Sequence, residues 1–359
     1  MVNVALVHDF LLTIGGAEKV LETLWSIYRC PIYTCLFRQD VLKSLRIDTQ
    51  IFSSFFQRVP FSKQFHRALL PFLPFAVEQF DLENYELIIS SSYLAAKGVS
   101  VKSRQLHICY CHTPMRYIWD LYFLYLRSVP FGLKTLYRLI SHYLRIWDVT
   151  SSNRVDYFIS NSKYVASRVF KIYRRDSEVI YPPVDVKRIP LFEEKEDYYI
   201  VVSRLVEYKN VDIVVKAFSK LPEKKLIVVG TGPELKKLKR ISGENVKFLG
   251  RVSDEELYQL VGKARAFITA AEEDFGISTV EALACGTPVI GYGVGGTSEI
   301  VEDLREGVLF WKQEVEEVVK AIQVFERCSF SPRKLREKAL KFDKEVFIKN
   351  FQSFVESVI

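Results

Sequence analysis

The residues whose types and spacing could most clearly act on a ligand lie between positions 271 and 300, AEEDFGISTVEALACGTPVIGYGVGGTSEI. Glu273 and Glu281 are separated there by seven residues. Ser278 stands three positions before Glu281, which is the spacing of a capping box. The first N–H groups of a helix have no partner within the helix and can bind an anion. Carboxylates beside a helix start suit a ligand with hydroxyl and phosphate groups; the alternative is that Glu281 only caps and the acids are merely solvated.

Three other side chains could act on such a ligand. Arg204 and Lys209 follow an apolar strand-like run, and two cations can neutralise a diphosphate without a metal ion. His112 follows the strand-like run 106–110. Ligands of open α/β sheets bind at the carboxyl ends of strands, so His112 lies where chemistry is usually placed, although a structural histidine is an equal alternative.

A glycine pair near the start of the chain adds a further candidate. Gly15 and Gly16 lie between a strand-like run at residues 4–7 and a segment with apolar residues at helical spacing. Strand, glycine turn and helix together build a phosphate-facing edge in α/β folds. A simple helix entry explains the pair as well.

Several other classes of site are excluded by their motifs. Gly230-Thr231-Gly232 follows a strand, but Leu235 occupies the third glycine position of the dinucleotide fingerprint. The sequence has no P-loop, no G-x-S-x-G elbow and no Asp-x-Asp pair after a strand. No histidine and cysteine spacing indicates zinc. We therefore expect neither a metal nor a cofactor.

Composition describes a folded protein without a spanning segment. The 359 residues favour two domains, and 49% hydrophobic with 26% charged residues are globular values. The net charge of +7 admits anionic partners but selects none. Six cysteines without a C-x-x-C pair indicate buried free thiols in a reducing cytosol. The first residues resemble a buried strand rather than a signal peptide, and no run reaches the roughly 18 apolar residues of a membrane span.

Alternation of strands and helices predicts two Rossmann-like, doubly wound α/β domains. Pro182 and Pro183 mark the linker between them. We expect an N-terminal domain at 1–183 and a C-terminal domain at 184–342. A helix at 343–359 would pack back across the junction. Its predicted buried face comprises Phe347, Phe351, Phe354, Val355 and Val358.

Two segments of the N-terminal half combine basic and aromatic residues without any acid. They lie between Thr49 and Val77 and between Asp120 and Asp148. Such composition favours contact with an anionic membrane surface, the alternative being helix core with a basic solvated face. No nucleic-acid-binding motif accompanies them, so we expect no nucleic acid. The predicted location is the cytoplasm, at the inner face of the cytoplasmic membrane.

An ordered set of motifs resembles a known family. The set is GGAE, a histidine after an N-domain strand, ISNS, YPPVD, SRL followed by a lysine, GTGPE, FLGRV and EDFGISTVEALACGTPVI. Together they resemble the retaining GT-B glycosyltransferases of family 4 (glycosyl transferases group 1), whose E-x7-E motif matches Glu273 and Glu281. HDF, GGAEKV and CHTPMRYIWD resemble the GDP-mannose-dependent mannosyltransferase branch of bacterial surface-polysaccharide synthesis.

The resemblance implies roles for individual residues. His112, Glu273, Arg204 and Lys209 would be the catalytic set: Glu273 binds the donor sugar's hydroxyls, the two cations neutralise the leaving diphosphate, and His112 contacts the 6-hydroxyl side of the sugar. Glu281 would hold the ribose. The remaining donor-binding positions are Gly15, Gly16, Gly250, Arg251, Val252, Phe275, Gly276, Ile277, Ser278 and Thr279. The fold would be GT-B, with both domains facing a central cleft. Domain 1–183 would bind the acceptor and domain 184–342 the nucleotide-sugar.

The function implied is transfer of mannose from GDP-mannose to a lipid-linked or oligosaccharide acceptor, with retention and without a metal. A UDP-sugar or another GDP-hexose is the alternative donor. A sugar-nucleotide epimerase and a non-catalytic subunit of a glycan-assembly complex are alternatives of other classes. No spacing rule identifies the acceptor.

Overall fold

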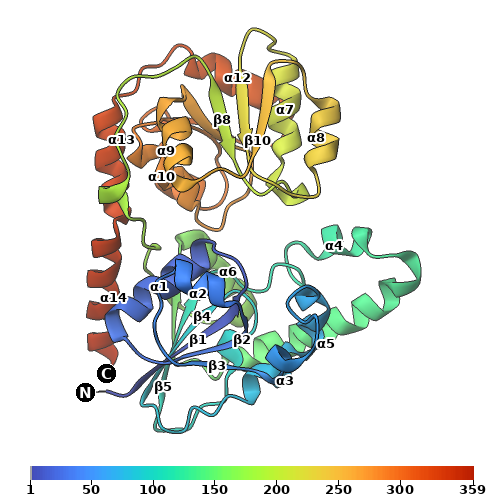
Figure 1. The fold of residues 1–359 in the computed structure, drawn as a ribbon, viewed down its shortest axis with the longest axis vertical. Helices are drawn as coiled ribbons and strands as arrows, with labels where there is room; N and C mark the ends of the chain where they lie inside the picture. Colours follow the sequence, from blue (N-terminus) through green and yellow to red (C-terminus); the bar gives the residue numbers. More distant parts are fainter. Residues whose placement is uncertain (1) are drawn as a thin grey trace. The chain divides into compact units, whose positions relative to one another are not determined.

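The computed structural model describes residues 2–359, which form two compact units. The first comprises the chain up to Pro183 together with Phe347–Ile359, and the second is Val184–Val346. Each unit contains one wholly parallel sheet with helices on its faces (Figure 1). The prediction of two Rossmann-like α/β domains is therefore confirmed.

The sheet of the first unit has seven strands in the order β3-β2-β1-β4-β5-β6-β7. Their bounds are β1 (Val4–Leu11), β2 (Ile32–Phe37), β3 (Ile51–Ser53), β4 (Leu87–Ser92), β5 (Leu106–Cys111), β6 (Tyr157–Ser160) and β7 (Ser177–Val179). β1, β4 and β5 are almost entirely buried, because parallel strands covered on both faces have no exposed side. In the register of β1 and β4, His8 lies opposite Ser91.

Helices cover both faces of this sheet. The α-helices are α1 (Gly16–Tyr28), α2 (Gln39–Ser44), α3 (Leu73–Glu78), α4 (Tyr122–Ser128), α5 (Lys134–Ser152), α6 (Lys163–Tyr173) and α14 (Lys344–Val358), with 3-10 turns η1 (Phe55–Arg58), η2 (His66–Phe72), η3 (Ala96–Gly98) and η4 (Phe131–Leu133). α1, α2 and α14 share one apolar cluster with the sheet. α3 and α5 contribute to a second cluster.

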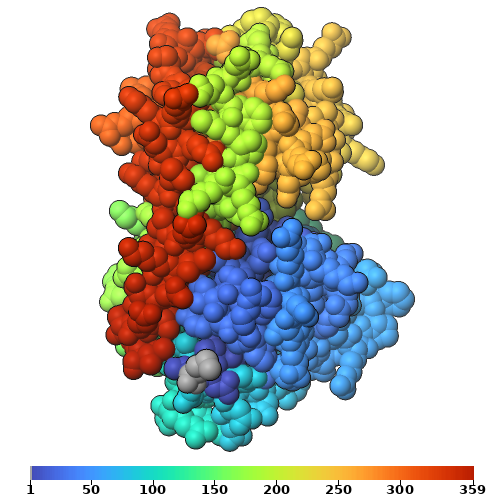
Figure 2. Space-filling model, turned by 60° about the vertical axis from the view of Figure 1, so that its left-hand side comes forward, coloured from blue at the N-terminus to red at the C-terminus, as the bar shows by residue number. Residues whose placement is uncertain are grey.

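The C-terminal helix α14 completes the core of the first unit. Phe347, Phe351 and Val355 are buried, and Phe354 and Val358 pack beside them, as predicted for this face. The ring of Phe347 lies 5.7 Å from that of Tyr110 in β5, edge to face. Figure 2 shows this helix in red against the blue residues of the first unit.

The second unit has a six-stranded sheet in the order β10-β9-β8-β11-β12-β13. Its strands are β8 (Tyr199–Val202), β9 (Leu226–Val229), β10 (Val246–Gly250), β11 (Ala266–Thr269), β12 (Val289–Tyr292) and β13 (Gly307–Phe310). Its helices are α7 (Val211–Ser219), α8 (Leu235–Ile241), α9 (Asp254–Lys263), α10 (Ile277–Ala284), α11 (Thr297–Ile300), α12 (Val315–Phe325) and α13 (Pro332–Ala339), with 3-10 turns η5 (Val186–Arg188), η6 (Glu207–Lys209) and η7 (Leu340–Phe342).

Two helices begin at serine N-caps, and two other local features agree with the sequence expectations. Ser162 caps α6 by accepting the N–H of Val165, and Ser253 caps α9 by accepting that of Glu256. All six cysteines are free, and five are buried. Among residues 2–359, every helix is too short or too polar to cross a bilayer.

Candidate functional site

The predicted residues of the second unit gather at the carboxyl edge of its sheet. β8 and β11 are parallel neighbours, so their carboxyl ends lie side by side. Arg204 and Lys209 follow β8, and Glu273 follows β11. Gly250 ends β10, and Arg251 and Val252 follow it at the same edge.

Lys209 and Glu273 form an ion pair within this edge. The Lys209 Nζ donates to Glu273 Oε1 at 2.7 Å and to Oε2 at 2.6 Å. The side chains are only 14% and 17% exposed. Partial burial strengthens the attraction between the charges, and the bidentate contact orients the carboxylate. The residues predicted to bind diphosphate and sugar therefore hold each other in place.

A close backbone contact fixes the loop that carries Glu273. The Gly296 N–H donates to the Glu273 carbonyl at 2.8 Å. A Cβ at Gly296 would lie 2.3 Å from the Phe275 Cα, and a Cβ at Gly295 would lie 2.5 Å from the Glu273 carbonyl oxygen. Only glycine allows this approach, so the glycine turn after β12 positions the acidic loop.

The start of α10 differs from the prediction. The helix begins at Ile277 with Gly276 as its N-cap, and no side chain caps it. Gly276 has φ of +106°, a backbone conformation that glycine adopts without strain. Because the chain turns at Gly276, the helix begins one residue before Ser278. Ser278 is thus the second helical residue, and its assignment as the cap of a Ser278–Glu281 capping box is wrong.

This start limits which groups of α10 are accessible. Thr279 is fully buried, and its N–H donates to the Gly276 carbonyl at 2.9 Å. The Phe275 side chain is buried against Phe342, which leaves only its backbone for a ligand. Ile277, Ser278 and Glu281 are half-buried. The accessible first turn therefore consists of Ile277 and Ser278, and the E-x7-E glutamates flank it.

Tyr208 is a candidate that the sequence did not reveal. Its hydroxyl accepts a hydrogen bond from Arg204 Nη2 at 2.7 Å, and Lys209 Nζ lies 5.7 Å from the centre of its ring. Tyr208 therefore stands between the two cations predicted to meet the diphosphate. Its position between SRL and the lysine was the only signal available in the sequence.

His112 lies at the carboxyl edge of the first unit's sheet. It follows β5 directly, its N–H donates to the Ser92 carbonyl at 2.9 Å, and its carbonyl accepts from Asn161 Nδ2 at 2.9 Å. His112 is only 8% exposed. Burial, with a smaller contribution from nearby His8, lowers the pKa of His112 to about 3, so the ring is neutral at physiological pH.

A chain of polar contacts links His112 to the glycine pair. His112 Nε2 lies 2.8 Å from Ser91 Oγ, and Ser91 Oγ lies 3.1 Å from His8 Nδ1. His8 Nε2 lies 3.6 Å from Glu18 Oε1, while Glu18 Oε2 accepts the Gly15 N–H at 2.8 Å. Gly15 is the N-cap of α1, and Gly16 is its first residue. The two predicted elements of this unit are thus ends of one network.

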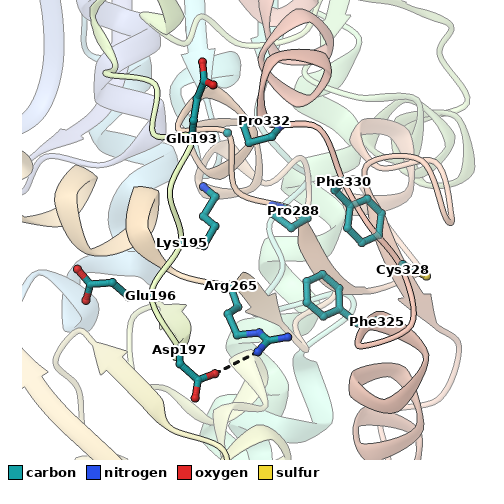
Figure 3. Close-up of a pocket in the computed structure, with 11 residues that line it drawn as sticks. Glu193, Lys195, Glu196, Asp197, Arg265, Pro288, Phe325, Cys328, Phe330 and Pro332 are labelled. Carbon is teal, nitrogen blue, oxygen red and sulfur yellow. Dashed lines mark hydrogen bonds and ion pairs between the residues drawn. The ribbon is translucent and has the colours of Figure 1, made fainter.

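A cavity of about 430 Å³ lies elsewhere in the second unit (Figure 3). Its lining residues Asp197, Arg265 and Pro288 precede β8, β11 and β12, so it lies at the opposite edge of the sheet from Glu273. Lys195 donates there to the Gly262 carbonyl, and burial lowers its pKa to about 8. None of the predicted site residues lines this cavity. Among residues 2–359, no group of histidine, cysteine or acidic residues could hold a metal ion.

Comparisons with known proteins identify the family. Residues 35–188 match the model Glycosyltransferase Family 4, and residues 185–342 match the model Glycosyl transferases group 1. The chain belongs to the family 4 glycosyltransferases. The second match contains the ion pair and the start of α10 described above.

Relatives of this family 4 chain are distant. Uncharacterized glycosyltransferase MJ1069 of Methanocaldococcus jannaschii is 25% identical over 57% of the chain and 59% of its own length. MJ1178 of the same organism is 31% identical over 43% and 45%. The yeast Alpha-1,3/1,6-mannosyltransferase ALG2 is 24% identical over 63% and 58%. The chain thus spans about half the length of the relatives that it matches.

Solved structures show the same GT-B fold. HepE of Anabaena in complex with UDP-glucose has a TM-score of 0.73 at 20% identity, covering 99% of both chains. Sucrose-phosphate synthase of Thermosynechococcus elongatus has a TM-score of 0.72 at 16% identity, covering 100% of this chain and 99% of its own. The GT-B fold prediction is confirmed.

Proposed function

We propose that this chain is a retaining glycosyltransferase that transfers mannose from GDP-mannose to a lipid-linked or oligosaccharide acceptor. The observation that carries the proposal is the Lys209–Glu273 ion pair beside the bare first turn of α10. One element offers a carboxylate to sugar hydroxyls, another a cation to phosphate, and the helix start adds unpaired N–H groups. That combination matches the chemistry of a nucleotide-sugar.

In the proposed reaction, the nucleotide diphosphate leaves and the acceptor hydroxyl attacks the sugar carbon from the same face. Arg204 and Lys209 would stabilise the charge that develops on the leaving diphosphate, so no metal ion is required. Glu273 would orient the sugar through its hydroxyls, and His112 would contact the 6-hydroxyl side. Glu281 would hold the ribose, while Gly250, Arg251 and Val252 would border the base.

Mannose is favoured over other sugars by the HDF, GGAEKV and CHTPMRYIWD motifs. A relative named as a mannosyltransferase supports this choice. A UDP-sugar is the second candidate donor, because the similar GT-B structure of HepE was solved with UDP-glucose. An epimerase would form product without an acceptor, and a non-catalytic subunit would bind donor without turnover.

Calorimetric titration with GDP, UDP, GDP-mannose and UDP-glucose separates the donors. We expect GDP-mannose to bind most tightly, and Glu273→Gln to lose most of the sugar's contribution while GDP affinity is retained. The matched control is Glu272→Gln in the same acidic loop. Tighter binding of UDP-glucose than of GDP-mannose would identify a UDP-sugar as the donor. Mannose transfer at the wild-type rate by Glu273→Gln would refute the assigned site.

We also propose that the first unit contacts an anionic membrane surface. Of 24 large hydrophobic side chains that are exposed among residues 2–359, 14 lie within residues 55–75 and 123–146. On α5, Leu136, Leu139, Tyr143 and Ile146 form an exposed apolar stripe at helical spacing. Exposed basic residues accompany them, and no acid lies within 49–77 or 121–147.

The two segments belong to neighbouring elements. Trp147 Nε1 of α5 donates to Glu78 Oε1 of α3 at 2.9 Å, and side chains from η2, α3 and α5 share one apolar cluster. Figure 1 shows α5 alongside α3. A basic apolar surface of this kind would place the protein at the inner face of the cytoplasmic membrane, where a lipid-linked acceptor is accessible.

Vesicle flotation tests this surface. We expect binding to vesicles that contain an anionic lipid, weaker binding to purely zwitterionic vesicles, and release by salt. Phe131→Glu with Leu139→Glu should reduce flotation, because both side chains are exposed in the native fold. Leu304→Glu, at a similarly exposed position of the second unit, is the control. Equal flotation of the two variants, or a change only in self-association measured by sedimentation, would refute membrane contact.

A further inference from the structure

In the first unit, three side chains that were not predicted as site residues connect the glycine pair Gly15-Gly16 to His112. Glu18, His8 and Ser91 lie between the Gly15 N–H and the His112 ring. His8 and Ser91 are completely buried, and Glu18 is 6% exposed. Their order in the network determines where the protons lie.

The Ser91 hydroxyl has a single proton and lies between two imidazole rings. Its Oγ lies within hydrogen-bond distance of both His8 Nδ1 and His112 Nε2. A hydroxyl group donates one hydrogen bond and can accept two, so at most one of the two ring nitrogens can accept the Ser91 proton. When Nδ1 of His8 accepts that proton, Nε2 of His112 has to donate to Ser91.

Glu18 biases the tautomer of His8. Its Oε1 lies 3.6 Å from His8 Nε2, and a carboxylate favours a proton on the facing nitrogen. In the tautomer with its proton on Nε2, His8 presents the lone pair of Nδ1 to the Ser91 hydroxyl. Ser91 then donates its proton to His8 and accepts the Nε2–H of His112.

We propose that Glu18, His8 and Ser91 are positioning residues that hold His112 with its proton on Nε2 and its lone pair on Nδ1. Nδ1 makes no hydrogen bond to any of residues 2–359 and is the ring atom left for a ligand. On the proposed function, its partner is a sugar hydroxyl that donates a proton. The tautomer itself does not depend on that function.

Nuclear magnetic resonance of protein labelled with ¹⁵N-histidine tests the tautomer directly. We expect a pyridine-type shift for Nδ1 of His112 and a pyrrole-type shift for Nε2. Ser91→Ala and Glu18→Gln should each give mixed tautomers. A pyrrole-type Nδ1 in the wild type, or an unchanged ring in both variants, would overturn the proposal.

Ser90 provides a matched control on the same strand. It is equally buried, and its Oγ lies 2.8 Å from Nε2 of His107, a histidine outside the predicted site. Ser90→Ala thus removes a comparable buried contact and should leave the His112 shifts unchanged. In transfer assays we expect Ser91→Ala to lower kcat/KM about tenfold more than Ser90→Ala does. Equal losses would reduce Ser91 to a structural role.

Donor analogues test the direction of the His112 hydrogen bond. Replacing the 6-hydroxyl of the donor sugar by hydrogen or by fluorine removes its ability to donate, so both analogues should lose the same affinity for the wild type. A fluoro analogue that binds like the parent sugar would show that Nδ1 donates. If no donor is transferred, the proposed function fails, while the ¹⁵N shifts still decide the proposal.

Discussion

A double-mutant cycle on Lys209 and Glu273 probes the centre of the second unit's site. Lys209→Met keeps the apolar stem and removes the charge, and Glu273→Gln keeps the shape of the partner. Exposed ion pairs contribute about 0.2–1 kcal/mol, whereas breaking a fully buried pair costs about 3–5 kcal/mol. With side chains 14% and 17% exposed, this pair lies between those limits.

We expect each single substitution to destabilise the second unit by about 2 kcal/mol, which lowers its melting temperature by roughly 4–8 °C. The double substitution should cost much less than the sum, because the first change already breaks the contact. Differential scanning calorimetry measures these shifts. Nucleotide-sugar affinity should show the same non-additivity.

Lys216→Met is the control for charge removal. Lys216 pairs with Asp212 at 2.8 Å on the exposed surface of α7, where loss of the pair should cost under about 0.5 kcal/mol. Stability effects at Lys209 and Glu273 that add within about 0.5 kcal/mol would refute the coupling and leave the two residues as independent contacts.

Three further predictions concern positions described above. Gly296→Ala should weaken donor binding and destabilise the second unit, because its Cβ would overlap Phe275; Gly132→Ala, where a Cβ meets nothing within 4 Å, is the control in thermal and binding assays. Burial lowers the pKa of His107 to about 4, so only the unfolded chain takes up a proton on this ring between pH 6.5 and 4. The free energy of unfolding, measured in urea, should therefore fall by about 3 kcal/mol as the pH is lowered from 6.5 to 4. His107→Gln should flatten this pH dependence. Phe351→Ala should cost about 3–5 kcal/mol in the first unit by hydrogen exchange, whereas exposed Val346→Ala should change little.

Periodicity was sufficient to predict the fold. Buried apolar runs alternating with amphipathic helices predict parallel sheets, and the spacing of Phe347, Phe351 and Val355 predicts the buried face of α14. These features depend on residues close together in the chain.

The site contacts depend on strand order, which the sequence does not state. Lys209 meets Glu273 because β8 neighbours β11, and His8 meets Ser91 because β1 neighbours β4. The error at Ser278 has a different cause. A glycine in the left-handed conformation leaves no pattern that distinguishes it from a flexible turn, so Gly276 as the cap could not be foreseen.

The position of α14 has a consequence for synthesis on the ribosome. The first unit emerges early, yet its apolar core stays open until Phe347 and Phe351 have been made, after the whole second unit. At about 5–20 residues per second, that delay is on the order of 10–30 s. A nascent chain stalled before residue 347 would expose the rings of β5 and α1, and would be a substrate for chaperones rather than a finished half of the protein.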